Sequence, residues 1–208
     1  MKKGVFLSFE GIEGTGKSTQ ARLLFEHLRE KGLDAVLTEE PGGTAIGRKI
    51  REVLLSTDHQ EMTPLTELLL YFASRTQHLA QVIIPAINRG AVVITDRFTD
   101  STIAYQGYGR GISLDLLYSL DTIATKGMRP DLTMLLDLDV ETGLSRNRET
   151  LKADRLELED IEFHKRVRNG FLDLAAQEPG RIKLLDASPD RDEISERIRD
   201  LVMDSLSS

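Results

Sequence analysis

Eight residues near the N-terminus have the types and spacing of a phosphate-binding loop. Residues 11–18 read Gly-Ile-Glu-Gly-Thr-Gly-Lys-Ser and match the pattern G-x-x-x-x-G-K-[ST]. The glycines allow a tight turn whose backbone N–H groups point at phosphate oxygens. Lys17 can then reach the β- and γ-phosphates, and the Ser18 hydroxyl can bind Mg²⁺. An apolar run, Val5–Phe9, precedes the loop, which argues against a chance match and predicts a nucleoside triphosphate site.

A carboxylate and a guanidinium follow a second apolar run, Ala91–Thr95. Asp96 stands where a carboxylate of the Walker-B type would hold Mg²⁺ directly or through water. Arg97 would lie beside it at the edge of a sheet and face the phosphates. A salt-bridged pair that caps a strand is the structural alternative. Because the phosphate loop should follow an adjacent strand, we favour a role in the site.

Polar side chains on two other segments could bind part of a ligand. Residues 101–107 read Ser-Thr-Ile-Ala-Tyr-Gln-Gly and offer hydroxyl, phenol and amide groups within helical reach of the Asp-Arg pair. Thr102 and Tyr105 are three residues apart and can share a helix face. Tyr71 and Arg75 are four residues apart on a long predicted helix. That spacing alone more often marks ordinary helix surface than a binding site.

Strands and helices alternate along the chain. Near-continuous apolar runs such as Ala91–Ile94 indicate strands buried on both faces, as in a parallel sheet covered by helices. The predicted strands are Val5–Phe9, Ala35–Thr38, Ala91–Thr95, Leu132–Leu138 and Ile182–Leu185. The predicted helices cover residues 17–31, 45–56, 64–88, 114–126, 141–148, 160–177 and 190–206. This order predicts an α/β fold with one doubly wound, five-stranded parallel sheet and ligands at the carboxyl ends of its strands.

Length and composition fit a single domain, which we expect to span residues 1–208. The absence of cysteine excludes disulfides, thiolate metal sites and a cysteine nucleophile. The net charge of −7 argues against a broad nucleic-acid-binding surface. No run is long enough for a membrane span or a signal peptide, so we expect a cytoplasmic protein. The histidines form no ligand pattern, and we expect surface or helix-packing roles for His27, His59, His78 and His164.

Residues 149–159 are densely charged and read Glu-Thr-Leu-Lys-Ala-Asp-Arg-Leu-Glu-Leu-Glu. They carry neither a strand pattern nor a clear apolar stripe. A solvated loop or helix face is one interpretation. A lid that closes over phosphates is the other, because phosphoryl transfer benefits from the exclusion of water. The residues themselves favour neither.

Taken together, these segments resemble the thymidylate kinases, a family of P-loop nucleoside monophosphate kinases. The matching segments are the phosphate loop at 11–18, Glu40-Pro41-Gly42-Gly43-Thr44, Tyr71 with Arg75, residues 96–107 (D-R-F-T-D-S-T-I-A-Y-Q-G), residues 129–133 and residues 154–157. The resemblance runs from end to end, and the loop and the 96–107 stretch are its specific parts. Two positions depart from it: Glu39 stands where arginine is frequent, and Tyr71 stands where phenylalanine is usual, a change compatible with stacking.

The resemblance implies transfer of the γ-phosphoryl group of ATP to dTMP, which gives dTDP and ADP, with Mg²⁺ at Ser18 and Asp96. ATP would be bound by Gly11, Ile12, Glu13, Gly14, Thr15, Gly16, Lys17, Ser18 and Thr19. The dTMP site would comprise Glu13, Glu40, Pro41, Arg51, Tyr71, Arg75, Arg97, Ser101, Thr102, Tyr105 and Gln106. The catalytic residues would be Lys17, Arg97, Arg146 and Arg148. A homodimer is also expected on this basis.

The resemblance also assigns a role to most of these side chains. Tyr71 would stack on thymine, Arg75 would hydrogen-bond the base, and Thr102 and Gln106 would read its polar edge. Tyr105 would crowd the 2′ position, while Glu13 would approach the 3′-hydroxyl. The acceptor phosphate would be bound by Arg97 and Arg51, with Glu40-Pro41 lining the monophosphate side. No general base is needed, because the second pKa of a monophosphate is near 6 and the attacking oxygen is already ionised.

Some family members carry a basic residue inside the phosphate loop, and others place catalytic arginines in the lid. The variable loop positions here, Ile12, Glu13 and Thr15, are not basic. The lid, at about residues 146–159, must therefore supply positive charge from Arg146, Arg148 or Arg155. Arg146 and Arg148 are two residues apart and point in different directions on a helix, so we expect one of them to reach the γ-phosphate.

Three alternative functions are compatible with a phosphate loop. A kinase for another deoxynucleoside or nucleotide monophosphate would share the loop and the Asp-Arg pair. A GTP-binding switch protein should carry D-x-x-G and N-K-x-D motifs, and the chain contains neither. A non-catalytic ATP-binding regulator is disfavoured by the intact Lys17, Ser18 and Asp96.

Overall fold

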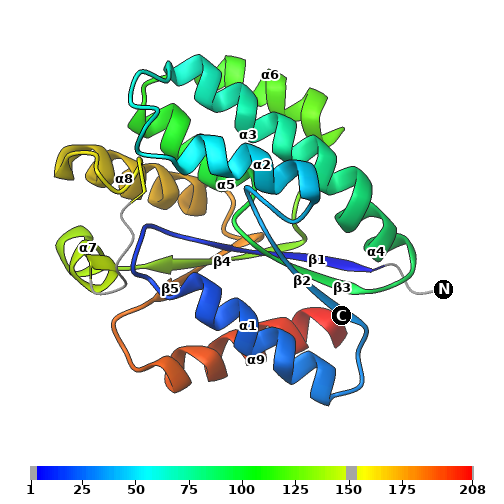
Figure 1. The fold of residues 1–208 in the computed structure, drawn as a ribbon. Coiled ribbons are helices and arrows are strands. Elements are labelled where there is room, and N and C mark those ends of the chain that lie inside the picture. Colours follow the sequence, from blue (N-terminus) through cyan, green and yellow to red (C-terminus); the bar gives the residue numbers. More distant parts are fainter. Residues whose placement is uncertain (1–3, 149–153, 208) are drawn as a thin grey trace.

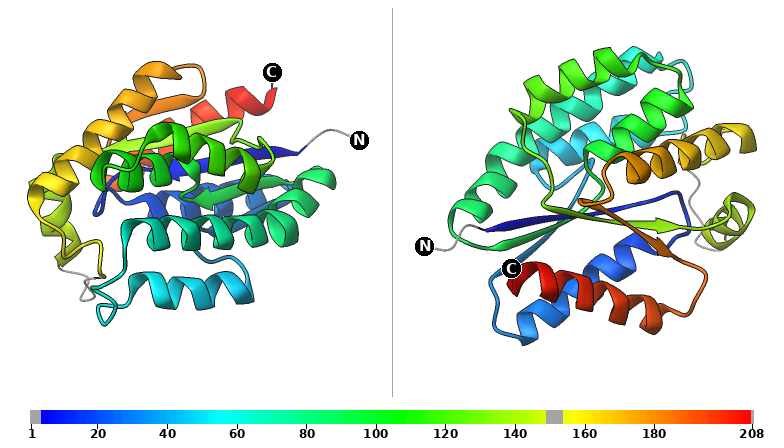
Figure 2. Two further views of the ribbon diagram at one scale, coloured as in Figure 1. Left: turned by 90° about the horizontal axis from the view of Figure 1, so that it is seen from above. Right: turned by 180° about the vertical axis from the view of Figure 1, so that it is seen from behind.

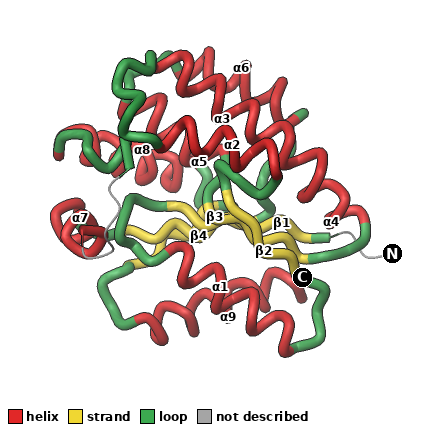
Figure 3. The backbone as a smooth tube through the Cα atoms, viewed as in Figure 1, coloured by secondary structure: helices red, strands yellow, loops and turns green. Residues whose placement is uncertain are grey.

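In the part of the chain that the structure describes, residues 4–148 and 154–207, five parallel strands form one central sheet (Figures 1 and 3). The structure is a computed structural model. The strands are β1 (Val5–Glu10), β2 (Ala35–Glu39), β3 (Val92–Asp96), β4 (Leu132–Asp137) and β5 (Ile182–Asp186). They lie in the order β2-β3-β1-β4-β5, with β1 at the centre, β3 and β2 on one side of it, and β4 and β5 on the other. The predicted doubly wound parallel sheet is confirmed.

The register of the sheet brings the two predicted phosphate-facing motifs together. β1 pairs with β3 so that Phe9 lies opposite Asp96. Because parallel strands share one carboxyl edge, the phosphate loop after β1 and Arg97 after β3 leave the sheet side by side. The backbone N–H of Arg97 donates a hydrogen bond to the Phe9 carbonyl at 3.0 Å, which joins the two segments directly.

Helices cover both faces of the sheet (Figure 2). They are α1 (Lys17–Glu30), α2 (Ala45–Leu55), α3 (Pro64–His78), α4 (Ile84–Asn88), α5 (Thr99–Thr102), α6 (Leu114–Thr125), α7 (Val140–Arg148), α8 (Ile161–Gln177) and α9 (Arg191–Ser207). Helices α1 and α9 lie on one face, and α2, α3, α6 and α8 lie on the other (Figure 1). None of the helices in the described segments is long and apolar enough to cross a membrane.

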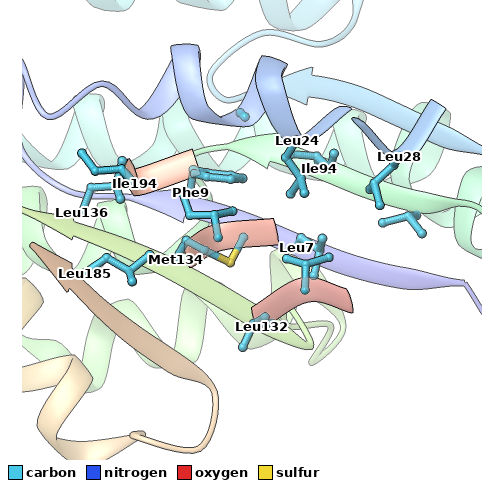
Figure 4. Close-up of a cluster of buried hydrophobic side chains, with 14 of the residues drawn as sticks. Leu7, Phe9, Leu24, Leu28, Ile94, Leu132, Met134, Leu136, Leu185 and Ile194 are labelled. Carbon is cyan, nitrogen blue, oxygen red and sulfur yellow. The ribbon is translucent and has the colours of Figure 1, made fainter. Parts of the chain in front are cut away.

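The two faces of β1 serve different purposes because alternate side chains point to opposite sides of a strand. Leu7 and Phe9 are fully buried against α1 and α9, where they meet Leu24, Met134 and further apolar residues (Figure 4). The alternating set of β1, which includes Glu10, faces the other helical layer. This face is buried as well, so β1 places a carboxylate inside the protein just before the phosphate loop.

The predicted helix 64–88 contains a turn of π-helix. α3 is followed by the π-helical segment Leu79–Ile83 (η1) and then by α4. Pro85 lacks a backbone N–H, and its ring would clash with the carbonyl four residues earlier in an α-helix. The wider turn, in which the N–H of Ile84 donates to Leu79, accommodates that proline. Thr63 caps the N-terminus of α3 by accepting from the N–H of Thr66, and this start was predicted from Thr63-Pro64.

The list of predicted helices omits residues 99–109, although Thr102 and Tyr105 were expected to share a helix face. These residues form α5 and a second π-helical segment, Ile103–Gly109 (η2). The reason for the omission is their polarity, since α5 consists of buried polar residues and shows no apolar stripe. Asp100 forms two hydrogen bonds with Arg181, at 2.7 and 2.8 Å, and the Thr99 hydroxyl donates to Asp121 at 2.8 Å. These partners are distant in sequence and therefore invisible to a pattern of local periodicity.

Candidate functional site

A cavity of about 440 Å³ opens at the carboxyl ends of β1 and β3. Its walls come from the phosphate loop, the segments after β2 and β3, α3, and the described part of the lid. Most of the predicted site residues line it: Glu13, Gly14, Gly16, Lys17, Ser18, Thr19, Glu40, Pro41, Arg51, Tyr71, Arg75, Asp96, Arg97, Ser101, Thr102, Tyr105, Gln106 and Arg146. The fold thus brings together residues from five separate stretches of the sequence in one space.

Four predicted residues are not among those that line the cavity. Gly11, Ile12 and Thr15 belong to the phosphate loop, but they are not among the residues that line the cavity. The Thr15 hydroxyl donates to the Ile12 carbonyl at 2.9 Å, and the Ile12 side chain is buried in the apolar layer. Arg148 closes α7, and its side chain lies outside what the structure describes.

The phosphate loop is held in shape by its lysine and by a close approach of α7. The ammonium of Lys17 donates to the Ile12 carbonyl at 2.7 Å and is almost fully buried. Gly14 has φ of 73°, and a Cβ at this position would lie 2.0 Å from the Gly143 carbonyl oxygen. Glycine is therefore required at residue 14 both by backbone conformation and by space. The Ser18 hydroxyl at the start of α1 donates to the Asp96 carboxylate, which joins the loop to β3.

Arg97 lies between the phosphate loop and α5. Its guanidinium donates to the Gly11 carbonyl at 3.0 Å, to the Ser101 hydroxyl at 2.9 Å and to the Glu13 carboxylate at 3.2 Å. The Arg97 backbone has φ of 71°, a conformation that costs about 1–3 kcal/mol for a residue with a side chain. Burial opposes the charge, but the adjacent Tyr105 and Glu13 raise the pKa of Arg97 and keep it protonated.

The buried Glu10 side chain holds the segment around Arg97 in place. Glu10 accepts from the backbone N–H of Phe98 at 2.7 Å and from the Ser101 hydroxyl at 2.5 Å. Phe98 follows Arg97, and Ser101 binds its guanidinium, so Glu10 fixes the turn and one partner of Arg97 at the same time. Burial, reinforced by the nearby Asp100, raises the pKa of Glu10 to about 8.

A second buried carboxylate holds Arg75 at the far end of the cavity. Glu40 accepts from Nε of Arg75 at 2.7 Å and from Nδ1 of His78 at 2.9 Å. Nη2 of Arg75 donates to the Thr102 hydroxyl at 2.8 Å. Nη1 of Arg75 is buried but has no hydrogen-bond partner among the described residues. A charged donor that lines a cavity and has no protein partner is suited to a ligand acceptor.

A third buried carboxylate, Glu67 on α3, connects the lid to this end of the cavity. It accepts from the side-chain amide of Gln106 at 2.9 Å, from Arg110 at 3.2 Å, and from Arg155. Burial opposes its ionisation, but the hydrogen bonds from Arg110 and Gln106 hold the pKa of Glu67 below its usual value. Arg155 also donates to the Leu54 carbonyl at 3.1 Å.

Arg155 therefore does not serve as the phosphate-facing lid residue that the sequence allowed. Its side chain is buried against α3 and paired with Glu67. Arg146 is exposed, lines the cavity and donates to the Ala187 carbonyl at 3.1 Å. Of the lid arginines with described side chains, Arg146 is thus the one that faces the cavity. The five central residues of the predicted lid, 149–153, lie outside the described residues.

Sequence reasoning missed Glu10, Glu67, His78 and His164. All four are buried and contact site residues. The helix-packing role expected for the histidines fits the buried His78 of α3, but its hydrogen bonds to Glu40 and Thr38 were not predicted. The available signal was a charged residue at an inward-facing position, such as Glu10 in an apolar strand or Glu67 within the Leu-rich start of α3.

Comparison with known proteins adds to this geometry. A sequence model of the family described as thymidylate kinase matches residues 9–198. This chain belongs to the thymidylate kinase family. It is 50% identical over 203 residues to a thymidylate kinase of Exiguobacterium, and the alignment covers 98% of this chain and 96% of that relative. It is 55% identical over 185 residues to one from Pseudomonas fluorescens, with 89% and 88% covered. A crystal structure of thymidylate kinase from Ehrlichia chaffeensis superposes with a TM-score of 0.79 at 34% identity, with 97% and 99% of the two chains covered.

The pKa of Glu10 generates a prediction about stability. The pKa of Glu10 is about 8 in the folded protein, against an ordinary value of 4.5 for the unfolded chain. Between pH 4.5 and 8, therefore, Glu10 is protonated in the folded protein and ionised in the unfolded chain. The free energy of unfolding should therefore fall as the pH rises from about 5 to about 8, by up to about 1.4 kcal/mol per pH unit from this group. Glu10→Gln stays neutral in both states and should lack this slope. Urea unfolding of both proteins across the pH range checks this, and parallel curves would contradict it.

Proposed function

We infer that this chain transfers the γ-phosphoryl group of ATP to dTMP, giving dTDP and ADP for the supply of DNA precursors. Family membership supports the reaction. The observation that assigns the reaction to specific residues is a cavity that is lined both by the phosphate loop and by the buried Arg75 with its partners. The phosphate loop offers hydrogen-bond donors for phosphates. Nη1 of Arg75, which has no partner among the described residues, and the ring of Tyr71 can contact a base.

The thymine base is bound at the Arg75 end. Nη1 of Arg75 donates to a carbonyl oxygen of the base, which satisfies the one buried guanidinium nitrogen without a partner. Tyr71 on the same helix provides a ring for stacking. Thr102 and Gln106 read the polar edge, each already oriented by a hydrogen bond, from Arg75 and to Glu67 respectively.

The sugar lies against Glu13 and Tyr105, which both line the cavity. The Tyr105 hydroxyl donates to the Glu13 carboxylate, so the phenol ring is fixed where it crowds the 2′ position and favours deoxyribose. Glu13 accepts from the 3′-hydroxyl. Glu13 is ionised at neutral pH. Burial opposes this, but the contact with His164 and the charges of Arg97 and Lys17 lower the pKa of Glu13 to about 2.

The acceptor phosphate is bound by Arg97 and Arg51. Arg51 lines the cavity, and its Nη1 donates to the Pro41 carbonyl at 2.7 Å. Glu39, at the position where arginine is frequent, lies 3.4 Å from the same nitrogen. We propose that Glu39 orients Arg51, which gives this departure from the family pattern a structural role. Lys17, Arg97 and Arg146 then stabilise the charge of the transferred phosphoryl group.

The oxygen atoms of Ser18 and Asp96 are suited to bind Mg²⁺. Mg²⁺ prefers oxygen ligands, several of which are usually phosphate oxygens and water molecules. The Ser18 hydroxyl and the Asp96 carboxylate are such oxygens and already adjoin each other. Within the described segments, no group of three or more His, Asp or Glu could hold a metal ion alone. When bound, Mg²⁺ neutralises charge on the β- and γ-phosphates.

A cytoplasmic location stays a prediction.

A coupled ADP-release assay tests the substrate. With Mg²⁺–ATP, we expect strong preference for dTMP over dUMP, dCMP, dGMP, AMP and UMP, because the base is read by Arg75, Thr102 and Gln106. Activity centred on another monophosphate would retain the kinase chemistry but reject this base site. Absence of turnover with all six would reject the proposed acceptor.

The lid generates a second prediction. Replacing both Arg146 and Arg148 with Ala should lower kcat by about a hundredfold or more, because positive charge at the transferred group acts mainly in the transition state. The affinity for dTMP, measured by calorimetry, should change little. Arg89→Ala, at a pair with Asp34 away from the cavity, serves as the control. Near-normal turnover in the double variant would remove the lid arginines from the mechanism.

We also propose that a second copy of the chain covers the outer face of α2, α3 and α6. Helix α3 packs against both neighbours, and each of the three helices exposes a pair of large apolar side chains at helical spacing. These are Ile46 and Val53, Leu65 and Leu69, and Leu116 and Ile123, which are between 42% and 74% exposed. A patch spread over three adjacent helices is typical of a protein interface.

Sedimentation equilibrium tests the dimer. The wild-type chain should sediment as a dimer, and the double variant Leu65→Glu, Leu69→Glu should sediment as a monomer, since two charges would be buried in the interface. Leu184→Glu, at an exposed position on β5, should remain dimeric. A monomeric wild-type protein at micromolar concentration would contradict the proposal.

A further inference from the structure

Three unsatisfied polar atoms meet beside the phosphate loop. His164 on α8 is fully buried, and neither of its ring nitrogens has a hydrogen-bond partner in the described part of the chain. Nδ1 of His164 lies 3.5 Å from Oε2 of Glu13, which also has no partner. Leaving a buried polar atom unsatisfied costs about 1–3 kcal/mol, so such a cluster calls for an explanation.

The imidazole is buried between the start of α8 and the ring of Phe163. Asp160 caps the N-terminus of α8 by accepting from the N–H of Phe163 at 2.7 Å. The Phe163 ring packs edge-on against the His164 ring, with centroids 5.5 Å apart, and edge-on against Tyr105 at 6.2 Å. The helix start and the aromatic contacts therefore limit the movement of the ring.

The two oxygens of Glu13 have different surroundings. Oε1 accepts from the Tyr105 hydroxyl and from Nη2 of Arg97. Oε2 faces His164. Because an ionised carboxylate can only accept, Nδ1 of His164 must carry the proton in this contact. His164 is also the foremost of the neighbours that lower the pKa of Glu13 against the effect of burial.

We propose that His164 is a positioning residue that holds the Glu13 carboxylate toward the 3′-hydroxyl of the nucleoside monophosphate, and so contributes to selection of substrates that carry this hydroxyl. The inference rests on the proposed sugar-binding role of Glu13. Slight movement of Glu13 shortens the Nδ1–Oε2 contact to a hydrogen bond, and the carboxylate is then restrained at both oxygens. Without the imidazole, Arg97 and Tyr105 restrain it from one side only.

The test compares two substrates, dTMP and 3′-deoxythymidine 5′-monophosphate, which lacks only the 3′-hydroxyl. His164→Leu should lower kcat/KM for dTMP about tenfold and leave kcat/KM for the 3′-deoxy analogue unchanged. His164→Asn places an amide nitrogen near the position of Nδ1 and should recover most of the loss. His59→Leu, at a half-exposed histidine away from the cavity, should change neither value. Circular dichroism and thermal unfolding establish that each variant is folded.

The outcomes separate this inference from the function on which it rests. Equal losses with both substrates would mean that His164 only stabilises the fold, and would overturn the proposal. An unchanged dTMP value in His164→Leu would overturn it too. If the wild-type enzyme treats the two substrates alike, the sugar-binding role of Glu13 fails, and the inference fails with it. If dTMP is not phosphorylated at all, the proposed function itself fails.

Discussion

The site depends on one guanidinium. Arg97 joins the loop after β1 to the helix after β3, because its hydrogen bonds reach Gly11, Glu13 and Ser101 at once. Its backbone adopts a conformation that is unfavourable for a non-glycine residue, and these contacts, together with the N–H bond to Phe9, maintain it. The same cation lines the cavity, where we propose that it binds the acceptor phosphate. Removing the Arg97 side chain would therefore break the hydrogen bonds that join Gly11 and Glu13 to Ser101, although the pairing of β1 with β3 would remain.

Three of the polar groups that line the cavity are each held in place by a buried acid. Glu10 fixes the turn of Arg97, Glu40 fixes Arg75, and Glu67 fixes Gln106. These acids are almost fully buried, and each accepts at least two hydrogen bonds, which offsets the cost of burying its polar oxygens. The ligand thus meets donors and cations that are already oriented, which lowers the cost of binding and suits a reaction that relies on positioning and charge stabilisation.

Local patterns were sufficient to predict the sheet, the phosphate loop and the Asp96-Arg97 pair, because each is encoded within a few consecutive residues. The supporting carboxylates were not predictable in the same way. Glu40 and Arg75 are 35 residues apart, Arg155 and Glu67 are 88 apart, and Ser101 and Glu10 are 91 apart. Arg155 shows the consequence: sequence placed it in the lid, but only the fold reveals the buried partner that turns it away from the phosphates.

The central claim is that one cavity holds both nucleotides with their phosphates meeting at Arg97. Calorimetry with a bisubstrate ligand, adenosine and thymidine joined 5′ to 5′ through a chain of phosphates, tests it most directly. The account predicts one ligand per chain, bound at least a hundredfold more tightly than dTMP or ATP alone, because the second nucleoside binds intramolecularly. An affinity no better than that of dTMP would show that the two nucleotides do not meet in this cavity, and would contradict the account.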